Sequence, residues 1–377
     1  MAKEMNPFVV SGIIPDEYFC DRVNESARLI KSVSNANNMV LISQRRMGKT
    51  GLIQHCYNKT EIKDQYYTFF IDILATTSLR EFTFLLGKAV YEGLIPQSRK
   101  MLNTFIQTLK SINGKFGFDP ISGLPTFNLE LGDIEHPEFT LEEIFLLLSK
   151  SDKRCLIAID EFQQISKYPE KNIEAILRTH IQNSDNLNFI FAGSERSILS
   201  TMFLSSARPF YRSADTMELG PIEEQIYTEF VSKQFFNNGR TVQADNIKYV
   251  YHLFNGHTFY IQKTFNEAYA ETSPGEECTK EKIQKAIEEI ILLNEINFRQ
   301  ILSQIPERQK ELLIAIAKEG QASEIMSNLF IKKHKLSTTS SIQSALKQLL
   351  KKDLITENFK TYSITDKLLS LWIKLNY

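Results

Sequence analysis

A short apolar run that leads into a glycine-containing loop constrains the fold of this chain most strongly. Residues 37–43, NNMVLIS, are bounded by polar residues and predict a buried strand, and residues 50–59, TGLIQHCYNK, predict a helix. The loop between them ends in Gly48, Lys49 and Thr50. A helix that begins directly after such a loop leaves backbone N–H groups free to bind an anion. The sequence therefore predicts a strand–loop–helix unit that can hold a phosphate group.

Three further apolar runs alternate with amphipathic segments. The runs cover residues 65–74, 153–165 and 186–194, and helices are predicted at 79–94 and 174–182. Strands that are apolar throughout and alternate with helices indicate a parallel sheet covered on both faces. We therefore expect an α/β fold. An irregular insert is expected at about residues 97–137, and the turn-forming residues within it predict a hairpin.

The pattern changes after residue 220. Four helices are predicted between residues 224 and 298, with few strand signals. From about Pro306 the pattern is three short helices followed by a two-stranded hairpin, which is typical of a winged helix. We therefore predict three domains, with an α/β domain over 1–220, a helical lid over 221–305 and a winged helix over 306–377.

The composition excludes several classes of protein. The net charge is −1, so no global field attracts nucleic acid, and any basic surface must be local. The four cysteines are far apart and form no CxxC pair, which argues against a zinc site and a disulfide framework. No apolar stretch approaches the roughly 18 residues that a membrane span needs. We expect a cytoplasmic protein with reduced thiols and no membrane partner.

The loop matches the phosphate-binding pattern GxxxxGK[ST] except at its first position, which is Ser43. Gly48 lets the backbone approach a phosphate closely, Lys49 reaches the phosphate oxygens and Thr50 is a ligand for Mg²⁺. A serine at the entry is small and can hydrogen-bond within the loop, so we expect it to be tolerated. The predicted nucleotide-binding residues are Ser43, Gln44, Arg45, Arg46, Met47, Gly48, Lys49, Thr50 and Gly51.

Two acidic residues complete the predicted site. Asp160 follows the apolar residues 156–159, and Glu161 comes directly after it. An acid at the end of a strand holds the Mg²⁺ of such sites, and a neighbouring carboxylate can act as general base towards water. A buried strand that merely ends in surface acids is the alternative. Because the acids follow a matching loop in the right order, we favour a site that binds ATP or ADP with Mg²⁺.

Two further candidates carry weaker signals. Ser194 ends the run at 186–194, where its hydroxyl could contact the γ-phosphate or the water, or simply form a turn. Arg212 could stabilise charge on the transferred phosphoryl group, from its own chain or from a second copy, or form a surface ion pair. Arg208 and Arg196 are less favoured positions. The predicted catalytic residues are Lys49, Glu161, Ser194 and Arg212.

These motifs resemble those of the archaeal-type ATPase family within the AAA+/STAND group of P-loop NTPases. The matching segments are FCDRVNESARLI (19–30), SQRRMGKT (43–50), LIAIDEFQ (156–163), FAGSERSIL (191–199), RPFYRS (208–213) and GHTFYIQ (256–262), followed by the winged helix. The resemblance implies a sheet of strand order 5-1-4-3-2, a helical lid, and ATP or ADP with Mg²⁺. It also assigns Lys49 to the phosphates, Thr50 and Asp160 to Mg²⁺, and Glu161 to catalysis.

The chain departs from the family pattern at three positions. Ser43 replaces the first glycine of the loop, Asp21 replaces the glycine of the opening motif, and Thr258 replaces the proline of the lid motif. The last change leaves the contacts to the base open. Arg22 in the opening motif lies either near the nucleotide or in a salt bridge at a helix start.

The sequence says less about the biological role of the protein than about its nucleotide site. From Ile325 to Lys352 the chain has six lysines and no acids, and Lys347, Lys351 and Lys352 fall on or just after the helix that would enter a DNA groove. A solvated helix face is the alternative. One hypothesis is an ATPase that couples its nucleotide state to movement of the lid and winged helix, acting on duplex DNA. The other is a switch that rests with ADP bound, turns over negligibly and acts through a protein partner or self-association.

Overall fold

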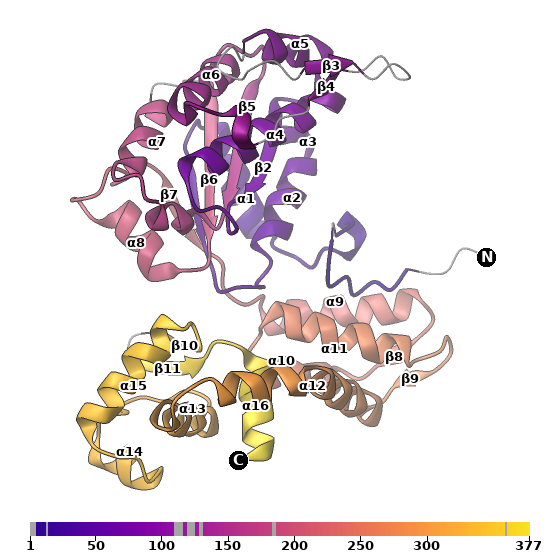
Figure 1. Cartoon of the computed structure of the whole chain (residues 1–377). Helices are drawn as coiled ribbons and strands as arrows, with labels where there is room; N and C mark the ends of the chain where they lie inside the picture. The colour runs from indigo at the N-terminus through magenta and orange to yellow at the C-terminus, as the bar shows by residue number, and fades with distance from the viewer. Residues whose placement is uncertain are drawn as a thin grey trace. The chain divides into compact units, whose positions relative to one another are not determined.

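The computed structural model describes residues 5–12, 14–108, 116–118, 125–127, 131–182, 186–358 and 360–377. The chain divides into two compact units (Figure 1). We call residues 13–220 the sheet unit, and residues 1–12 together with 221–377 the helical unit.

The sheet unit is built on five parallel strands. They are β1 (Met39–Ile42), β2 (Tyr66–Asp72), β5 (Arg154–Asp160), β6 (Leu187–Gly193) and β7 (Asp215–Glu218). Their order across the sheet is β2-β5-β6-β1-β7, and every neighbouring pair is parallel. Counted along the chain this is 2-3-4-1-5, so the predicted order 5-1-4-3-2 is confirmed. Strand β7 was not read directly from the sequence, because it has four residues and only Met217 is buried.

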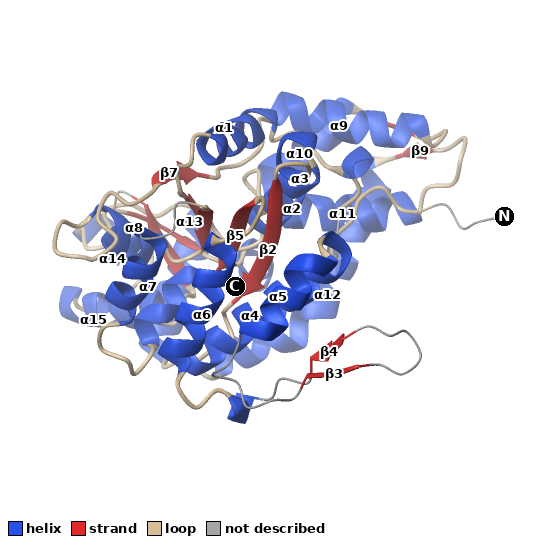
Figure 2. Cartoon of the chain, turned by 90° about the horizontal axis from the view of Figure 1, so that it is seen from above, coloured by secondary structure: helices blue, strands red, loops and turns tan. Residues whose placement is uncertain are grey.

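Helices cover both faces of this sheet, as the apolar runs predict (Figure 2). One face is covered by α1 (Val23–Ser34), α2 (Lys49–Asn58) and α3 (Thr60–Lys63). The other is covered by α4 (Leu79–Gln97), α5 (Arg99–Thr108), α6 (Pro137–Ser149), α7 (Ile173–Gln182) and α8 (Arg196–Leu204). Side chains of a strand alternate between its faces. In β5, Cys155, Ile157 and Ile159 therefore join one core, while Leu156 and Ala158 join the other.

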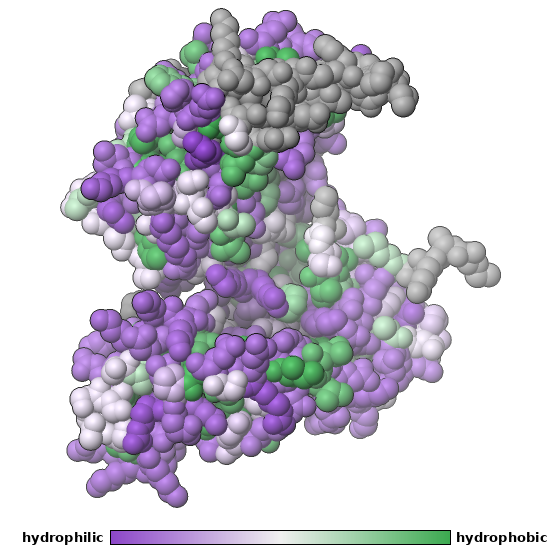
Figure 3. All heavy atoms as spheres, viewed as in Figure 1, coloured by the Kyte–Doolittle hydropathy of each residue, from purple (hydrophilic) through white to green (hydrophobic). Residues whose placement is uncertain are grey.

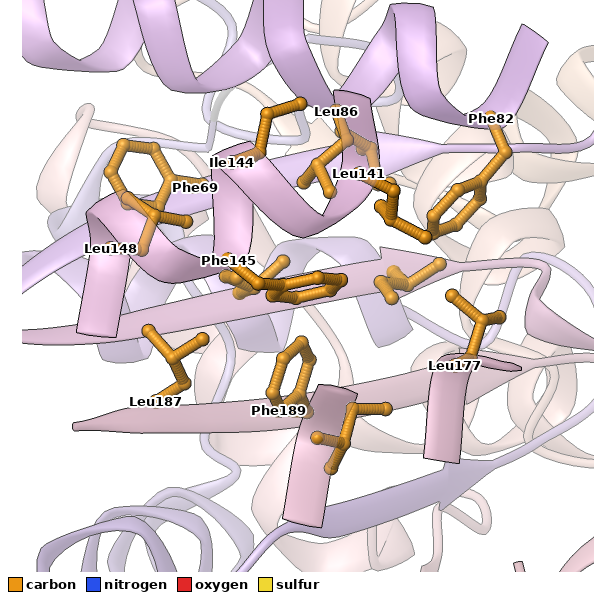
Figure 4. Packing of buried hydrophobic residues seen from close by; sticks show 14 of the residues in the cluster. Phe69, Phe82, Leu86, Leu141, Ile144, Phe145, Leu148, Leu177, Leu187 and Phe189 are labelled. Carbon is orange, nitrogen blue, oxygen red and sulfur yellow. The ribbon is translucent and has the colours of Figure 1, made fainter. Parts of the chain in front are cut away.

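The larger core packs helix α6 onto the strands (Figure 4). Leu141, Ile144, Phe145 and Leu148 recur at the spacing of one helix face and are buried. Phe189 of β6 lies below them, with its ring centre 5.9 Å from that of Phe145. This packing fixes the strands whose ends carry the predicted site.

The insert at about 97–137 contains a helix that the sequence did not predict. Helix α5 lies within it, because Met101, Leu102 and Phe105 form one buried face. Strands β3 (Phe116–Phe118) and β4 (Pro125–Phe127) pair antiparallel, which confirms the predicted hairpin, and a 3-10 helix follows at Leu131–Asp133. The residues between these strands lie outside the described part of the chain.

The helical unit begins with four helices and a two-residue strand pair. The helices are α9 (Glu224–Asn237), α10 (Ala244–Leu253), α11 (Thr258–Ala270) and α12 (Lys280–Ser303), and the strands are β8 (Thr241–Val242) and β9 (Glu277–Cys278). The N-terminal segment belongs to this unit because Phe8 is fully buried there. Its ring lies within 5.4 Å and 5.7 Å of the ring centres of Phe235 and Phe265.

The last part of the helical unit has the elements of a winged helix. These are α13 (Glu307–Glu319), α14 (Asn328–Lys333), α15 (Thr339–Lys351), β10 (Ile355–Asn358), β11 (Thr361–Ile364) and α16 (Lys367–Asn376). Strands β10 and β11 pair antiparallel as predicted. One feature differs from the prediction, since α16 was not foreseen. Asp366 caps α16, and Tyr260 of α11 donates a hydrogen bond of 2.5 Å to its carboxylate.

Candidate active site

The predicted site residues follow three neighbouring strands at one edge of the sheet. In the parallel register, Ile42 at the end of β1 pairs with Gly193 at the end of β6. Strand β6 also pairs with β5, which ends at Asp160. Because parallel strands end at the same edge, the loop after β1, Glu161 after β5 and Ser194 after β6 lie together there.

The loop after β1 has the backbone of an anion-binding turn. Arg46 and Gly48 both have positive φ, of 63° and 94°. Helix α2 then starts at Lys49, and no side chain caps its first N–H groups. These groups carry the positive end of the helix dipole, so they attract a phosphate. Gly48 is needed for its backbone conformation, since a side chain at this φ is strained.

Ser43 fits into the loop at the position where the pattern has glycine. Its side chain is buried, and its hydroxyl donates a hydrogen bond of 2.9 Å to the carbonyl oxygen of Gln44. Its N–H donates to the carbonyl oxygen of Gly193 at 3.2 Å, which continues the pairing of β1 with β6. Gln44, Arg45 and Arg46 are exposed. The serine therefore closes the loop entry by a local hydrogen bond.

Lys49, Thr50 and Asp160 form one group. The Thr50 hydroxyl donates a hydrogen bond of 2.7 Å to Oδ2 of Asp160, although the two residues are 110 positions apart. Lys49 is 6% exposed. Burial raises the pKa of Asp160, while the Thr50 hydrogen bond and the charge of Lys49 act in the opposite direction. A hydroxyl and a carboxylate held together are the oxygen ligands that Mg²⁺ prefers, so the residues fit this ion.

Glu161 is held by two donors. The Ser194 hydroxyl donates to its Oε2 at 2.8 Å, and the amide Nε2 of Gln163 donates to the same oxygen at 2.5 Å. The structure thus brings Ser194 to the predicted base, and not only into a turn. Gln163 was not among the predicted site residues. Its signal in the sequence was a polar residue two positions after Glu161, within the segment LIAIDEFQ.

An aromatic cluster fixes the backbone at Glu161. Strand β5 ends at Asp160, earlier than the apolar pattern at 153–165 suggested, because Glu161 adopts φ of 55° and a 3-10 helix follows at Phe162–Lys167. Phe162 is fully buried, with its ring centre 4.5 Å from that of Phe191 and 5.4 Å from that of Phe210. A left-handed backbone at a residue other than glycine is unfavourable and persists only where packing enforces it.

The predicted arginines are not joined to this group. Arg212 is exposed, its guanidinium lies 5.2 Å from the ring centre of Tyr211, and within the described residues no hydrogen bond or ion pair links it to Lys49, Asp160 or Glu161. Arg208 pairs with Glu174 at 3.4 Å. Arg196 pairs with Glu218 at 2.8 Å.

Arg22 of the opening motif bonds to the backbone of the loop. Its guanidinium is buried, pairs with Glu25 at 2.7 Å, and donates to the carbonyl oxygens of Gly220 at 2.7 Å and Met47 at 3.4 Å. The salt bridge at the helix start is thus present, and Arg22 also contacts the backbone of the loop. Asp21, which replaces the family glycine, has φ of 49°. Aspartate tolerates this conformation better than most residues, which explains the departure.

The lysines predicted for DNA are exposed in the helical unit. Lys347 and Lys351 lie on α15, and Lys352 follows it. The ammonium group of Lys352 donates a hydrogen bond of 3.1 Å to Oε1 of Gln309. Acidic residues from α13 offset part of the local charge, since Glu319 pairs with Lys333 and His334, both at 2.6 Å. The visible surface is mostly hydrophilic in both units (Figure 3).

A five-stranded parallel sheet in this order, with a glycine-lysine-threonine loop entering α2 and an acid at the end of β5, defines a P-loop NTPase. Residues 19–264 match a family described as an ATPase domain found predominantly in Archaea. The match covers more than half of the chain, so the chain belongs to this family. Residues 296–375 match a family described as a probable winged helix domain.

Solved structures share the fold along nearly the whole chain. A Walker-type ATPase of Pyrococcus abyssi is 19% identical, with a TM-score of 0.64 over 98% of this chain and 99% of that one. The ORC2 protein of Aeropyrum pernix, in ADPNP–ADP complexes, is 11% identical, with a TM-score of 0.60 over 99% and 98%. No curated protein matches the chain. Among the described residues, no helix is long and apolar enough to cross a membrane.

Proposed function

We propose that the site at the carboxyl ends of β1, β5 and β6 binds ATP with Mg²⁺ and hydrolyses it to ADP and phosphate. The backbone N–H groups of residues 43–51 surround the phosphates, and the ammonium group of Lys49 neutralises their charge. Thr50 and Asp160 hold Mg²⁺, which neutralises charge on the phosphates when bound. The nucleotide complexes of the ORC2 protein support nucleotide binding at this fold.

Glu161 is the base in this proposal. The oxygen of a water attacks the γ-phosphorus, the bond to the oxygen that bridges the β- and γ-phosphates breaks, and the water proton passes to the Glu161 carboxylate. The hydroxyl of Ser194 holds that carboxylate at 2.8 Å. Arg212 is proposed to contribute only in a conformation or assembly that brings its exposed guanidinium to the γ-phosphate.

The proposal depends most on one observation, which is that the two neighbouring acids have different hydrogen-bond partners. Asp160 bonds to the Thr50 hydroxyl, whereas Glu161 bonds to Ser194 and Gln163. A site that only held nucleotide as a structural support would need the first pair and has no use for the second. Neighbouring carboxylates that are held by separate partners can take separate roles.

The test is steady-state ATP hydrolysis by the purified chain, beside Glu161→Gln. Hydrolysis is expected in the wild type and should fall by a factor of about 10² to 10⁴ in the variant, the usual contribution of a general base. Both proteins should bind a fluorescent ATP analogue with similar Kd, because Glu161 does not hold the phosphates. Equal turnover in the two proteins would refute the role of Glu161.

The second candidate is a nucleotide-dependent switch with ADP bound at rest and a protein partner that triggers exchange. It uses the same binding residues, and ADP that co-purifies with a protein of negligible turnover would favour it. The exposed Lys347, Lys351 and Lys352 suggest duplex DNA as a partner of the hydrolysing form. Adding duplex DNA to the assay separates these hypotheses, since only a DNA-linked ATPase should turn over faster with it.

A further inference from the structure

Gln163 occupies a closed position between Glu161 and the end of strand β6. Its side chain is 1% exposed, and its Nε2 donates to Oε2 of Glu161 at 2.5 Å. On its other side lies Gly193, where an added Cβ would sit 2.0 Å from Oε1 of Gln163 and 2.7 Å from Cδ1 of Leu199. The absence of a side chain at Gly193 therefore makes the room in which the Gln163 amide lies.

The chemistry of the two groups fixes the orientation of the amide. An ionised carboxylate only accepts hydrogen bonds, so the NH₂ side of Gln163 must face Glu161 and the carbonyl side must face Gly193. In this orientation Oε1 is buried and has no hydrogen-bond partner among the described residues. A buried unpaired carbonyl is unfavourable, and such groups in native proteins call for an explanation. The explanation here is the hydrogen bond to Glu161, because it requires the NH₂ side of the amide and so leaves Oε1 on the side without a partner.

We propose that Gln163 is a positioning residue for ATP hydrolysis, which holds Oε2 of Glu161 together with Ser194 and so aims the other carboxylate oxygen at the attacking water. The inference rests on the proposed function, because it assigns to Gln163 the orientation of the base used there. Two donors from different elements fix the carboxylate plane better than one, since Ser194 follows β6 and Gln163 lies on the 3-10 helix after β5.

The charged groups around the carboxylate do not replace this contact. Asp160 precedes Glu161 and bonds to Thr50, and Lys49 from α2 acts on Asp160. From the 3-10 helix and the turn before α8, Lys167 and Glu195 pair with each other at 3.2 Å. The donors that reach Oε2 of Glu161 in the described part of the chain are thus Ser194 and Gln163.

The test compares Gln163→Met with Gln164→Met. Methionine keeps the length of the side chain and removes the amide, and Gln164 is the matched control because it bonds instead to the carbonyl oxygen of Thr76. We expect kcat to fall by roughly ten- to a hundredfold in Gln163→Met, the loss expected for a hydrogen bond to a charged group. The Kd of a fluorescent ATP analogue should stay within about twofold, and Gln164→Met should keep the wild-type kcat.

Gly193→Ala tests the same hydrogen bond without changing Gln163 itself. Its Cβ would displace the Gln163 amide, so kcat should fall while Kd stays near that of the wild type. In the double variant Gln163→Ala/Gly193→Ala the added methyl finds no amide to displace and meets only Cδ1 of Leu199, the end of a flexible side chain that can turn into the space left by the amide. Its kcat should therefore be no lower than that of Gln163→Ala alone, a non-additivity that a general loss of stability does not produce. Additive losses would overturn the proposal.

The outcomes also separate this inference from the function on which it rests. If the wild type turns over, Glu161→Gln does not, and Gln163→Met keeps the wild-type kcat, the role of Gln163 is wrong and the proposed function stands. If Gln163→Met and Gln164→Met lose kcat and nucleotide binding equally, the effect is structural and the inference is again wrong. A wild type without turnover overturns both.

Discussion

Replacing Thr50 by valine removes one hydroxyl and keeps the branched shape of the side chain. The hydroxyl donates at 2.7 Å to Asp160, whose side chain is 5% exposed. A hydrogen bond to a charged group contributes about 1.5–3 kcal/mol. Thr50 itself is exposed, and Asp160 keeps a second hydrogen bond of 3.0 Å from the N–H of Glu161. We therefore expect the lower part of the range, a loss of about 1.5–2 kcal/mol in the free energy of unfolding.

The loss should depend on pH with a definite sign. Burial raises the pKa of Asp160, and the Thr50 hydrogen bond counteracts that rise by favouring the ionised form. The valine variant therefore raises the pKa of Asp160 further. Its destabilisation should be full where Asp160 is ionised in both proteins, and should shrink as the pH falls through the raised pKa of the variant, because a protonated carboxyl needs the donor less.

Thermal unfolding and nucleotide titration measure the two consequences. For a unit of this size, the melting temperature without nucleotide should fall by roughly 3–8 °C at neutral pH. The Kd for ADP should weaken at least about tenfold with Mg²⁺ present, the scale on which metal sites lose affinity when a contributing group is removed. With EDTA the Kd should match that of the wild type. Thr50→Ser, which keeps the hydroxyl, is the control. A valine variant with wild-type stability and the wild-type response to Mg²⁺ would refute the reasoning.

Two further predictions concern the core of the sheet unit. Phe162→Ala should lower the free energy of unfolding by about 3–5 kcal/mol, because it empties a fully buried site among aromatic rings, whereas Phe139→Ala at a 63% exposed position should change it little. Urea unfolding of both variants checks this, and equal effects would contradict it. Burial raises the pKa of Cys20 and Cys155 to about 12 and that of Cys56 to about 11, so these thiols should stay unreactive towards a thiol reagent up to roughly pH 9 until the protein is unfolded. Rapid labelling of the native protein would contradict the packing around them.

The sequence by itself determined the elements that local patterns control. The apolar run before Ser43 and the triplet from Gly48 to Thr50 predicted a strand, a glycine-containing loop and a helix start, and the structure has all three. The apolar residues 156–159 followed by Asp160 likewise indicated a buried strand with an acid after them. These features depend on residues that are close along the chain, so their physical causes can be read there.

The elements that the sequence missed are stabilised by distant contacts. Helix α5 forms because its apolar face packs into the core beside α4 and α6. The short strand β7 forms because it pairs with the edge of β1 that β6 does not occupy. The strand at 153–165 was predicted too long because nothing local shows that Phe162 turns inward to meet Phe191 and Phe210.

Only the tertiary structure decided how the site is connected. It placed the Ser194 hydroxyl and the Gln163 amide on one oxygen of Glu161, bonded Arg22 to the carbonyl oxygens of Met47 and Gly220, and left Arg212 apart from the acids. The contacts of Ser194 with Glu161 and of Arg22 with Met47 and Gly220 join segments that are distant along the chain. Their distance in space depends on the order and register of the strands, which the packing of the whole unit sets and no local pattern records.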